Sequence, residues 1–222
     1  MKVTPISLGT TSCFLLSGEL GGLVLVDGGN PGDGLKVKQA IEEVGYRTSD
    51  LTLVVVTHGH SDHVGGLAEL EPYHSAKTVV GREDVKALTE GEGAPVVPAG
   101  PIGRLLKRVL PERDFAPLSE EPARMDEESL SLRAFGIDGE IIHLPGHTNG
   151  SLGVVSKKGP AVVGDLIMGR YVIFGRPRLP VFAEAPDAVE ESIRKVLERE
   201  PRVIYTSHGG PYKPESLERL LN

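Results

Sequence analysis

Short runs of apolar, mostly β-branched residues recur along the chain and alternate with turns rich in glycine and proline. Runs of this length between turn signals are typical of buried strands. The pattern predicts strands at residues 3–8, 13–17, 23–27, 51–56, 77–80, 129–134, 140–144, 152–156, 161–163 and 203–206. The turns at 18–22 and 157–159 each join two of these strands into a predicted hairpin.

Two longer segments carry apolar residues at helical spacing. The first is residues 35–44, which follow Asp33, a candidate N-cap, and end at Gly45. The second is residues 187–199, which follow Pro186, a residue suited to a first helical turn. Shorter helices are predicted at 64–70, 83–88 and 215–221. Strands and helices in this order favour a mixed α/β domain in which one sheet packs on another and helices lie outside.

Length, charge and cysteine content narrow the class of protein. A chain of 222 residues suits one large domain, so we expect a single domain over 1–222. The net charge of −7 argues against a nucleic-acid partner, which requires a basic surface. Cys13 is the only cysteine, so no internal disulfide can form. Without a signal-like N-terminus or a run long enough to span a membrane, we expect a cytoplasmic protein with no membrane partner.

Amide side chains are scarce, whereas charged residues and proline are plentiful. The amides are Gln39, Asn30, Asn149 and Asn222. Depletion of thermolabile residues is a feature of thermophilic proteins, so we hypothesise that the protein is thermostable.

The most informative motif is His58-Gly59-His60-Ser61-Asp62-His63, which lies between a predicted strand and a predicted helix. It therefore sits outside the carboxyl edge of a sheet, where sites in α/β proteins collect. Side chains alternate along an extended chain, so His58 and His60 point the same way. Asp62 and His63 fall on the turn that begins the helix and point elsewhere. One motif can thus supply two adjacent metal positions, and its imidazoles and carboxylate suit a borderline-soft divalent ion.

Three further candidate ligands follow apolar runs or lie in glycine-rich turns. They are His147, Asp165 and His208. Together with the motif, their types and order resemble the metallo-β-lactamase superfamily, in which HxHxDH is followed by His, Asp and His. The resemblance extends from the turn at 26–29 to His208. It implies a four-layer αββα sandwich with metal ions at one edge, but it does not single out one activity.

The resemblance also implies a division of the ligands between two divalent metal ions. The first ion would be bound by His58, His60 and His147, the second by Asp62, His63 and His208, and both by Asp165. We expect zinc, with iron or manganese as alternatives. A hydroxide held between the ions would be the nucleophile, because one zinc already lowers the pKa of bound water to about 7. Asp62 could also carry a proton, so we assign catalytic roles to Asp62 and Asp165.

Three residues outside the ligand set receive assignments of their own. Asp27 is predicted to support the metal loop, as an Asp at this place does in the superfamily. The alternative is a local acceptor that initiates the following turn. Of the two remaining histidines, His74 is predicted to lie at the surface and His143 to be packed in a strand.

Several activities of the superfamily can be weighed against this sequence. Zinc β-lactamases that resemble the motif lack the bridging Asp, so β-lactamase activity is not expected. RNA-processing members have a basic exosite, which the acidic charge disfavours. Homoserine-lactone hydrolases have a Tyr three residues after the bridging Asp, where this chain has Met168. Glyoxalase II enzymes have all seven ligands, and their compact forms are about this length. Their basic contacts to glutathione, however, do not map onto this sequence.

We therefore predict a dinuclear metal-dependent hydrolase that acts on a small anionic ester or thioester, as glyoxalase II does. The alternatives are a mononuclear iron persulfide dioxygenase and a metal-dependent phosphodiesterase. Arg170, Tyr171 and Arg176 follow Asp165 and are candidate substrate contacts, because guanidinium groups bind carboxylate or phosphate. The alternative is that these arginines are solvated at the surface. The oligomeric state cannot be predicted.

Residues 89–128 carry little core pattern and contain a short basic amphipathic piece at 102–110. A long segment of this kind is usually functional or mobile. In the superfamily such an insertion often covers the metal cleft, so we expect the same of 89–128. The alternative is a surface helix that packs on its Leu/Val stripe.

Overall fold

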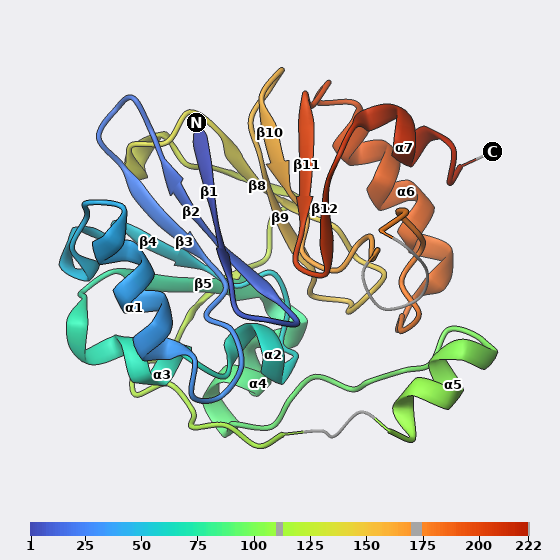
Figure 1. The fold of residues 1–222 in the computed structure, drawn as a ribbon, viewed down its shortest axis with the longest axis horizontal. Coiled ribbons are helices and arrows are strands. Elements are labelled where there is room, and N and C mark those ends of the chain that lie inside the picture. Colours follow the sequence, from blue (N-terminus) through green and yellow to red (C-terminus); the bar gives the residue numbers. More distant parts are fainter. Residues whose placement is uncertain (110–112, 170–174, 222) are drawn as a thin grey trace.

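The computed structural model describes residues 1–109, 113–169 and 175–221. Its strands form two sheets of six, which lie between two groups of helices (Figure 1). The first sheet has the order β1 (Lys2–Ser7), β2 (Ser12–Ser17), β3 (Leu23–Val26), β4 (Leu53–Val55), β5 (Lys77–Gly81) and β6 (Ala123–Met125). The second has the order β12 (Gly209–Tyr212), β11 (Val203–Thr206), β10 (Pro160–Val162), β9 (Leu152–Val155), β8 (Glu140–His143) and β7 (Ser129–Ser131).

Both sheets are mixed. Strands β1 to β3 pair antiparallel, and β3 to β6 pair parallel. In the second sheet the β10–β11 pair is parallel and the other pairs are antiparallel. The predicted hairpins β2–β3 and β9–β10 are therefore present.

The helices of the described residues are α1 (Gly34–Glu43), α2 (Ser61–Val64), α3 (Leu67–Leu70), α4 (Val85–Glu90), α5 (Pro101–Lys107), α6 (Pro186–Leu197) and α7 (Pro214–Glu218). Short 3-10 helices occur at Thr48–Asp50 (η1), Glu71–Tyr73 (η2), Arg82–Asp84 (η3) and Arg133–Phe135 (η4). Helices α1 and α3 lie on one side of the sheets and α6 and α7 on the opposite side (Figure 1). No helix in the described part of the chain is both long and apolar enough to cross a membrane.

Alternation along the strands explains why four layers form. In β2, Cys13 and Leu15 pack in the cluster that contains the apolar residues of α1 and α3. The intervening Phe14 and Leu16 pack in the cluster that contains Ile141 and the other inner-face residues of the second sheet. A third cluster joins the outer face of the second sheet to α6 and α7. Strands with two buried faces need cover on both, which confirms the four-layer αββα sandwich.

Two strands were not predicted from the sequence. The sequence pattern indicated 203–206 as the last strand, but the structure has a further strand, β12, after β11. Three of the four residues of β12 are glycine or proline, which are typical of turns, so the sequence pattern did not indicate a strand there. Strand β6 pairs with the edge of the first sheet although only Met125 of its three residues is buried.

The start of α1 also differs from the prediction. Asp33 occupies the N-cap position, but its carboxylate does not cap the helix; it accepts from the Asn30 side chain and pairs with Lys36. The carboxylate of Glu69, near the end of α3, instead accepts from the N–H groups of Gly32 and Gly34, at 2.7 and 3.1 Å. A residue distant in sequence therefore satisfies the first N–H group of this helix and one in the turn before it.

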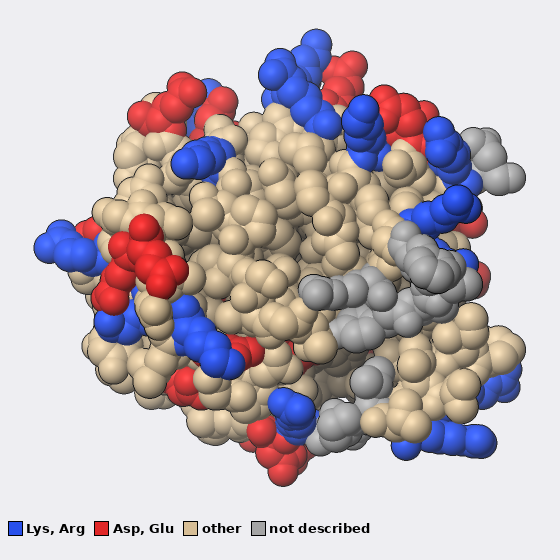
Figure 2. Space-filling model, in the orientation of Figure 1, with Lys and Arg blue, Asp and Glu red and all other residues tan. Residues whose placement is uncertain are grey.

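Charged side chains of both signs are interspersed around the edge of the face shown in Figure 2, while its centre is largely uncharged.

Candidate metal centre

Loops from both sheets meet at one edge of the sandwich and bring the predicted ligands together. His58, His60, Asp62 and His63 follow β4 of the first sheet. The other ligands come from the second sheet: His147 from the β8–β9 loop, Asp165 from the segment after β10, and His208 from the tight turn between β11 and β12. Gly164, next to Asp165, has a φ of +54°, and a Cβ there would lie 2.8 Å from Thr57 Cβ. Glycine therefore allows this segment to approach the first sheet closely.

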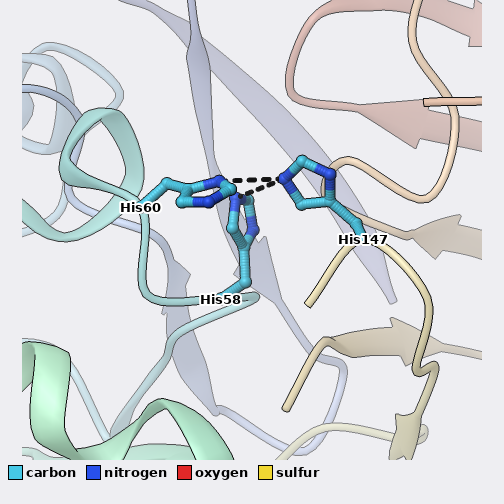
Figure 3. Close-up of side chains that lie close together, drawn as sticks. All are labelled: His58, His60 and His147. Carbon is cyan, nitrogen blue, oxygen red and sulfur yellow. Dashed lines mark hydrogen bonds between the residues drawn. The ribbon is translucent and has the colours of Figure 1, made fainter. Parts of the chain in front are cut away.

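The first cluster consists of three imidazoles that converge (Figure 3). His147 Nε2 lies 3.1 Å from His58 Nε2 and 2.9 Å from His60 Nδ1. All three residues are buried. Burial, with further contributions from the neighbouring imidazoles, holds the pKa of His58 well below its usual value, and burial with His147 lowers the pKa of His60 to about 4. The rings are therefore neutral at pH 7 and offer lone pairs.

The second cluster combines a carboxylate with two imidazoles. Asp62 Oδ2 lies 3.1 Å from His208 Nε2 and 3.8 Å from His63 Nε2. Burial opposes a charge on His63, but the carboxylates of Asp62, Asp165 and Asp27 outweigh it and raise its pKa to about 9. The pKa of His208 is shifted upwards in the same way, chiefly by Asp165 against burial. This half of the site therefore favours positive charge.

Asp165 lies between the two clusters. Its Oδ2 is 3.2 Å from His208 Nε2 and 3.7 Å from His147 Nε2, and its Oδ1 is 3.6 Å from His63 Nε2. Burial would raise the pKa of this carboxyl, but His208 and His63 outweigh burial and lower it to about 2. It is thus an ionised carboxylate within reach of ligands from both clusters.

The outward nitrogen of two of these imidazoles has a carbonyl acceptor, which determines the tautomer. His147 Nδ1 donates to the Phe182 carbonyl and His208 Nδ1 to the Thr10 carbonyl, each at 2.8 Å. A carbonyl only accepts, so the inward Nε2 of each ring carries the lone pair whenever the ring is neutral. Phe182 and Thr10 were not anticipated from the sequence, because a backbone carbonyl has no residue-type signal.

The residues present fit a pair of metal ions. In the first cluster the lone pair of neutral His147 Nε2 faces His58 Nε2 at 3.1 Å and His60 Nδ1 at 2.9 Å, so three ring nitrogens converge where a cation could accept all three. In the second cluster, His63 Nε2 and Asp165 Oδ1 are buried and have no hydrogen-bond partner among the described residues. Orphaned buried polar atoms are rare in proteins, and imidazole with carboxylate is a zinc-type donor set.

Asp27 supports the metal loop, which is the first of the two roles weighed for it. The side chain is buried and accepts from the Thr57 N–H at 2.7 Å, from the Thr57 hydroxyl at 2.8 Å and from His63 Nδ1 at 2.9 Å. The Thr57 hydroxyl oxygen in turn lies 3.1 Å from His58 Nδ1. One carboxylate therefore orients one imidazole of each cluster, one directly and one through a hydroxyl.

Asp27→Asn should weaken metal binding about 10- to 100-fold, the usual effect of losing a group that orients a ligand. The amide can no longer accept from all three donors, so the His63 ring loses its fixed tautomer. The measurement is zinc affinity by competition with a chelator. Asp138→Asn is the control, because its carboxylate is 70% exposed in an ion pair with Arg133. Unchanged affinity in Asp27→Asn would show that Asp27 serves only the fold.

A cavity of about 540 Å³ opens onto both clusters. Five candidate ligands line it: His60, Asp62, His147, Asp165 and His208. The segment 89–128 contributes seven lining residues: Glu92, Gly93, Ala94, Val96, Lys107, Arg113 and Asp114. Backbone hydrogen bonds hold this segment at the cavity, from Ala94 to Gly59 at 2.9 Å and between Ala183 and Val97 at 2.8 Å. The insertion thus forms part of the wall around the candidate metal centre.

Of the three predicted substrate contacts, only Arg176 lies in the described part of the chain. Arg170 and Tyr171 lie outside the described residues. Arg176 is exposed and is not among the described residues that line the cavity. Among the described residues, the cationic side chains that line it are Lys107 and Arg113, from the insertion. The sequence resemblance led us to expect residues 89–128 over the metal cleft, but it did not single out Lys107 or Arg113 as cavity-lining cations, because the loop path that brings them there has no sequence signature.

The two remaining histidines lie outside both clusters. His143 is part of β8, and its Nε2 donates to the Asn149 carbonyl at 2.8 Å, in keeping with the predicted strand position. His74 is half-buried rather than fully at the surface.

Comparison with known proteins decides the family. The sequence model described as the metallo-beta-lactamase superfamily matches residues 6–208. The chain belongs to the metallo-β-lactamase superfamily. The match spans the first strand to the last candidate ligand, and therefore every loop of the metal centre.

Similar superfamily members include curated proteins named as hydrolases. A probable metallo-hydrolase of Methanocaldococcus jannaschii, MJ0888, is 28% identical over 90% of this chain and 88% of its own. The hydroxyacylglutathione hydrolase GloC of Haemophilus influenzae is 27% identical over 100% of this chain and 96% of its own. These relatives support a metal-dependent hydrolase.

Solved structures of the superfamily share the fold at lower identity. The B3 metallo-beta-lactamase BLEG-1 has a TM-score of 0.67 and 20% identity, and the alignment covers 97% of this chain and 95% of that one. A metallo-beta-lactamase family protein from Thermus thermophilus, TTHA1429, has a TM-score of 0.66 and 19% identity, covering 99% of this chain and 77% of that one. At these identities the likeness concerns the fold alone.

Proposed function

We propose that the protein is a dinuclear metal-dependent hydrolase that acts on a small anionic ester or thioester. The observation that carries the proposal is the position of Asp165, whose two oxygens face ligands of both clusters. A shared carboxylate lets two cations approach to about 3.5–4 Å. Bound metal would supply Lewis acidity and lower the pKa of a coordinated water to about 7.

The chain's own residues divide the remaining work. His58, His60 and His147 would hold one ion, Asp62, His63 and His208 the other, and Asp165 both. Asp62 lines the cavity with its side chain one-third exposed, so it is the ligand carboxylate that can receive a proton from the reacting group. The carbonyls of Phe182 and Thr10 keep His147 and His208 in the tautomer that binds metal.

An anionic substrate is supported by the cavity wall. Lys107 and Arg113 line it together with the carboxylates Glu92 and Asp114, and ammonium and guanidinium groups are the side chains that recognise a substrate carboxylate or phosphate. Apolar residues line it as well, Val96, Met168 and Phe182 among them, which suits the acyl part of an ester or thioester. The similarity to the hydroxyacylglutathione hydrolase GloC over the whole chain favours a thioester.

We expect two metal ions per chain, mainly zinc, in protein purified without added metal, because seven donors in two clusters suit two ions. Elemental analysis measures this, and a panel of thioesters, lactones and phosphodiesters then identifies the substrate class. One iron per chain with oxygen uptake on persulfides would instead indicate a mononuclear dioxygenase. Hydrolysis confined to phosphodiesters would indicate a phosphodiesterase in which Lys107 and Arg113 bind the substrate phosphate.

A further inference from the structure

Asp84 is a buried carboxylate close to the metal centre that belongs to neither cluster. Its residue is 3% exposed, at the end of η3 and the N-cap position of α4. An Asp at this position usually accepts from the first N–H groups of its own helix. The Asp84 side chain makes no such bond. It is turned towards the loops that carry the three-histidine cluster.

Two donors, one from each of these loops, meet at this carboxylate. The Thr148 hydroxyl donates to Asp84 Oδ2 at 2.7 Å, and the Gly59 N–H donates to the same carboxylate. Burial raises the pKa of Asp84 to about 6 against the lowering effect of these donors, so at neutral pH it is mainly an anion that accepts both. Hydrogen bonds to a buried anion are among the strong ones.

The two donors to Asp84 lie next to candidate ligands in the sequence. Gly59 lies between His58 and His60, and Thr148 directly follows His147. The first loop extends from the first sheet and the second from the second sheet. Asp84 therefore connects, through one side chain, the two segments that supply all three imidazoles of the first cluster.

The packing around Asp84 leaves little room for the link to shift. A Cβ at Gly150 would lie 2.9 Å from Asp84 Cγ, so only glycine allows the His147 loop to come this close. On the far side, the Thr148 hydroxyl also lies 2.9 Å from Ser151 Oγ, and Ser151 Oγ accepts from the Thr148 N–H at 3.0 Å. Asp84 thus sits in a closed set of polar contacts in which each group has a partner.

We propose that Asp84, acting through Thr148 and Gly59, is a positioning residue that fixes the separation between the His58/His60 loop and the His147 loop. His147 Nε2 then stays close to the inward nitrogens of His58 and His60, at 3.1 and 2.9 Å, so that all three can reach one ion. This inference rests on the proposed metal centre and adds a residue that touches neither ion nor substrate.

The most informative variant is Thr148→Val, which keeps the shape of a fully buried side chain but removes its hydroxyl. Thr148→Ser keeps the hydroxyl and is the matched control. We expect zinc affinity, measured by chelator competition on metal-free protein, to fall about 10- to 100-fold in Thr148→Val and by less than about threefold in Thr148→Ser. The metal-free thermal midpoint of Thr148→Val should lie a few degrees below that of Thr148→Ser, because valine leaves a buried carboxylate without one of its donors. Zinc affinity is therefore compared at a temperature at which both variants are fully folded.

A second pair of variants tests the carboxylate itself. Asp84→Asn should lower zinc affinity by a factor similar to that for Thr148→Val, whereas Glu83→Gln, at the exposed neighbouring position, should leave it unchanged. Wild-type zinc affinity in Thr148→Val would overturn this inference alone. A wild-type chain that bound no zinc would overturn the proposed function, and this inference with it.

Discussion

Asp165→Asn should lower kcat/KM on the best substrate about 1000-fold or more, equivalent to about 4 kcal/mol of transition-state stabilisation. The asparagine keeps the size of the side chain but replaces one of its two acceptor oxygens by a donor. That amide nitrogen would face His63 on one side or His147 and His208 on the other, and an amide nitrogen has no lone pair to offer a metal ion. The bridge between the two clusters would be lost. Steady-state kinetics on metal-loaded protein measures the effect.

The same variant should retain its fold. Asp165 pairs with the ligands rather than with the strands, and the three apolar clusters that hold the layers together do not include it. Circular dichroism should therefore match the wild type, and the metal-free thermal midpoint should fall by only a few degrees, because His63 and His208 lose part of the carboxylate charge that raises their pKa. Asp187→Asn, at an exposed position in the first turn of α6, is the control and should keep full activity. An unfolded Asp165→Asn protein would mean that the centre is structural.

Removing the metal ions should lower the thermal midpoint by about 8–16 °C. A ligand that binds only the folded state at 1000 times its Kd stabilises by about 4 kcal/mol, and each kcal/mol shifts the midpoint of a chain this size by about 2–4 °C. Unfolding would be followed with and without a chelator, and readdition of zinc should restore the midpoint. A midpoint that does not respond to the chelator would contradict a metal centre assembled from these residues.

The fall in the thermal midpoint on metal removal should become larger as pH rises. In the metal-free fold the pKa of His63 is raised to about 9 and that of His208 is raised too, against about 6.5 in the unfolded chain. The stability that these protons provide is therefore complete below pH 6.5 and is lost as pH rises towards 9. Bound metal replaces the protons, so the loaded protein lacks this loss. The difference between loaded and chelated midpoints should widen from about pH 6.5 to about 9.

The sequence predicted the layers well because they have a periodic pattern, and it proposed the ligands from their residue types and spacing. The spacing of His58, His60, Asp62 and His63 indicated that one motif could supply two adjacent metal positions. In the structure these side chains fall in three overlapping groups that could hold an ion: His58/His60/His147, His58/His63/Asp165 and Asp62/His63/His208. The layers followed from alternation, as in β2, where odd and even residues pack in different apolar clusters. Both inferences depend on side-chain chemistry or periodicity, which a sequence displays directly.

What escaped prediction depends on the path of the backbone. The carbonyls of Phe182 and Thr10 hold ligand imidazoles, but any residue could provide a carbonyl. Strand β12 was not predicted because Gly209, Gly210 and Pro211 are typical of a turn. Asp84 belongs to an ordinary helix-start sequence, and only the fold brings it to Thr148, 64 residues further along the chain.

The origin of the ligands from both sheets has a kinetic consequence. His58 and His147 are 89 residues apart in sequence. His208 and Thr10, whose carbonyl accepts a hydrogen bond from the His208 ring, are 198 residues apart. Contacts of such separation form late in folding, because the entropy of closing the intervening chain is lost before they can form. Bound ions would therefore stabilise the native state more than the transition state. They should leave the folding rate nearly unchanged and lower the unfolding rate. The metal-loaded protein would therefore stay folded for a long time under denaturing conditions.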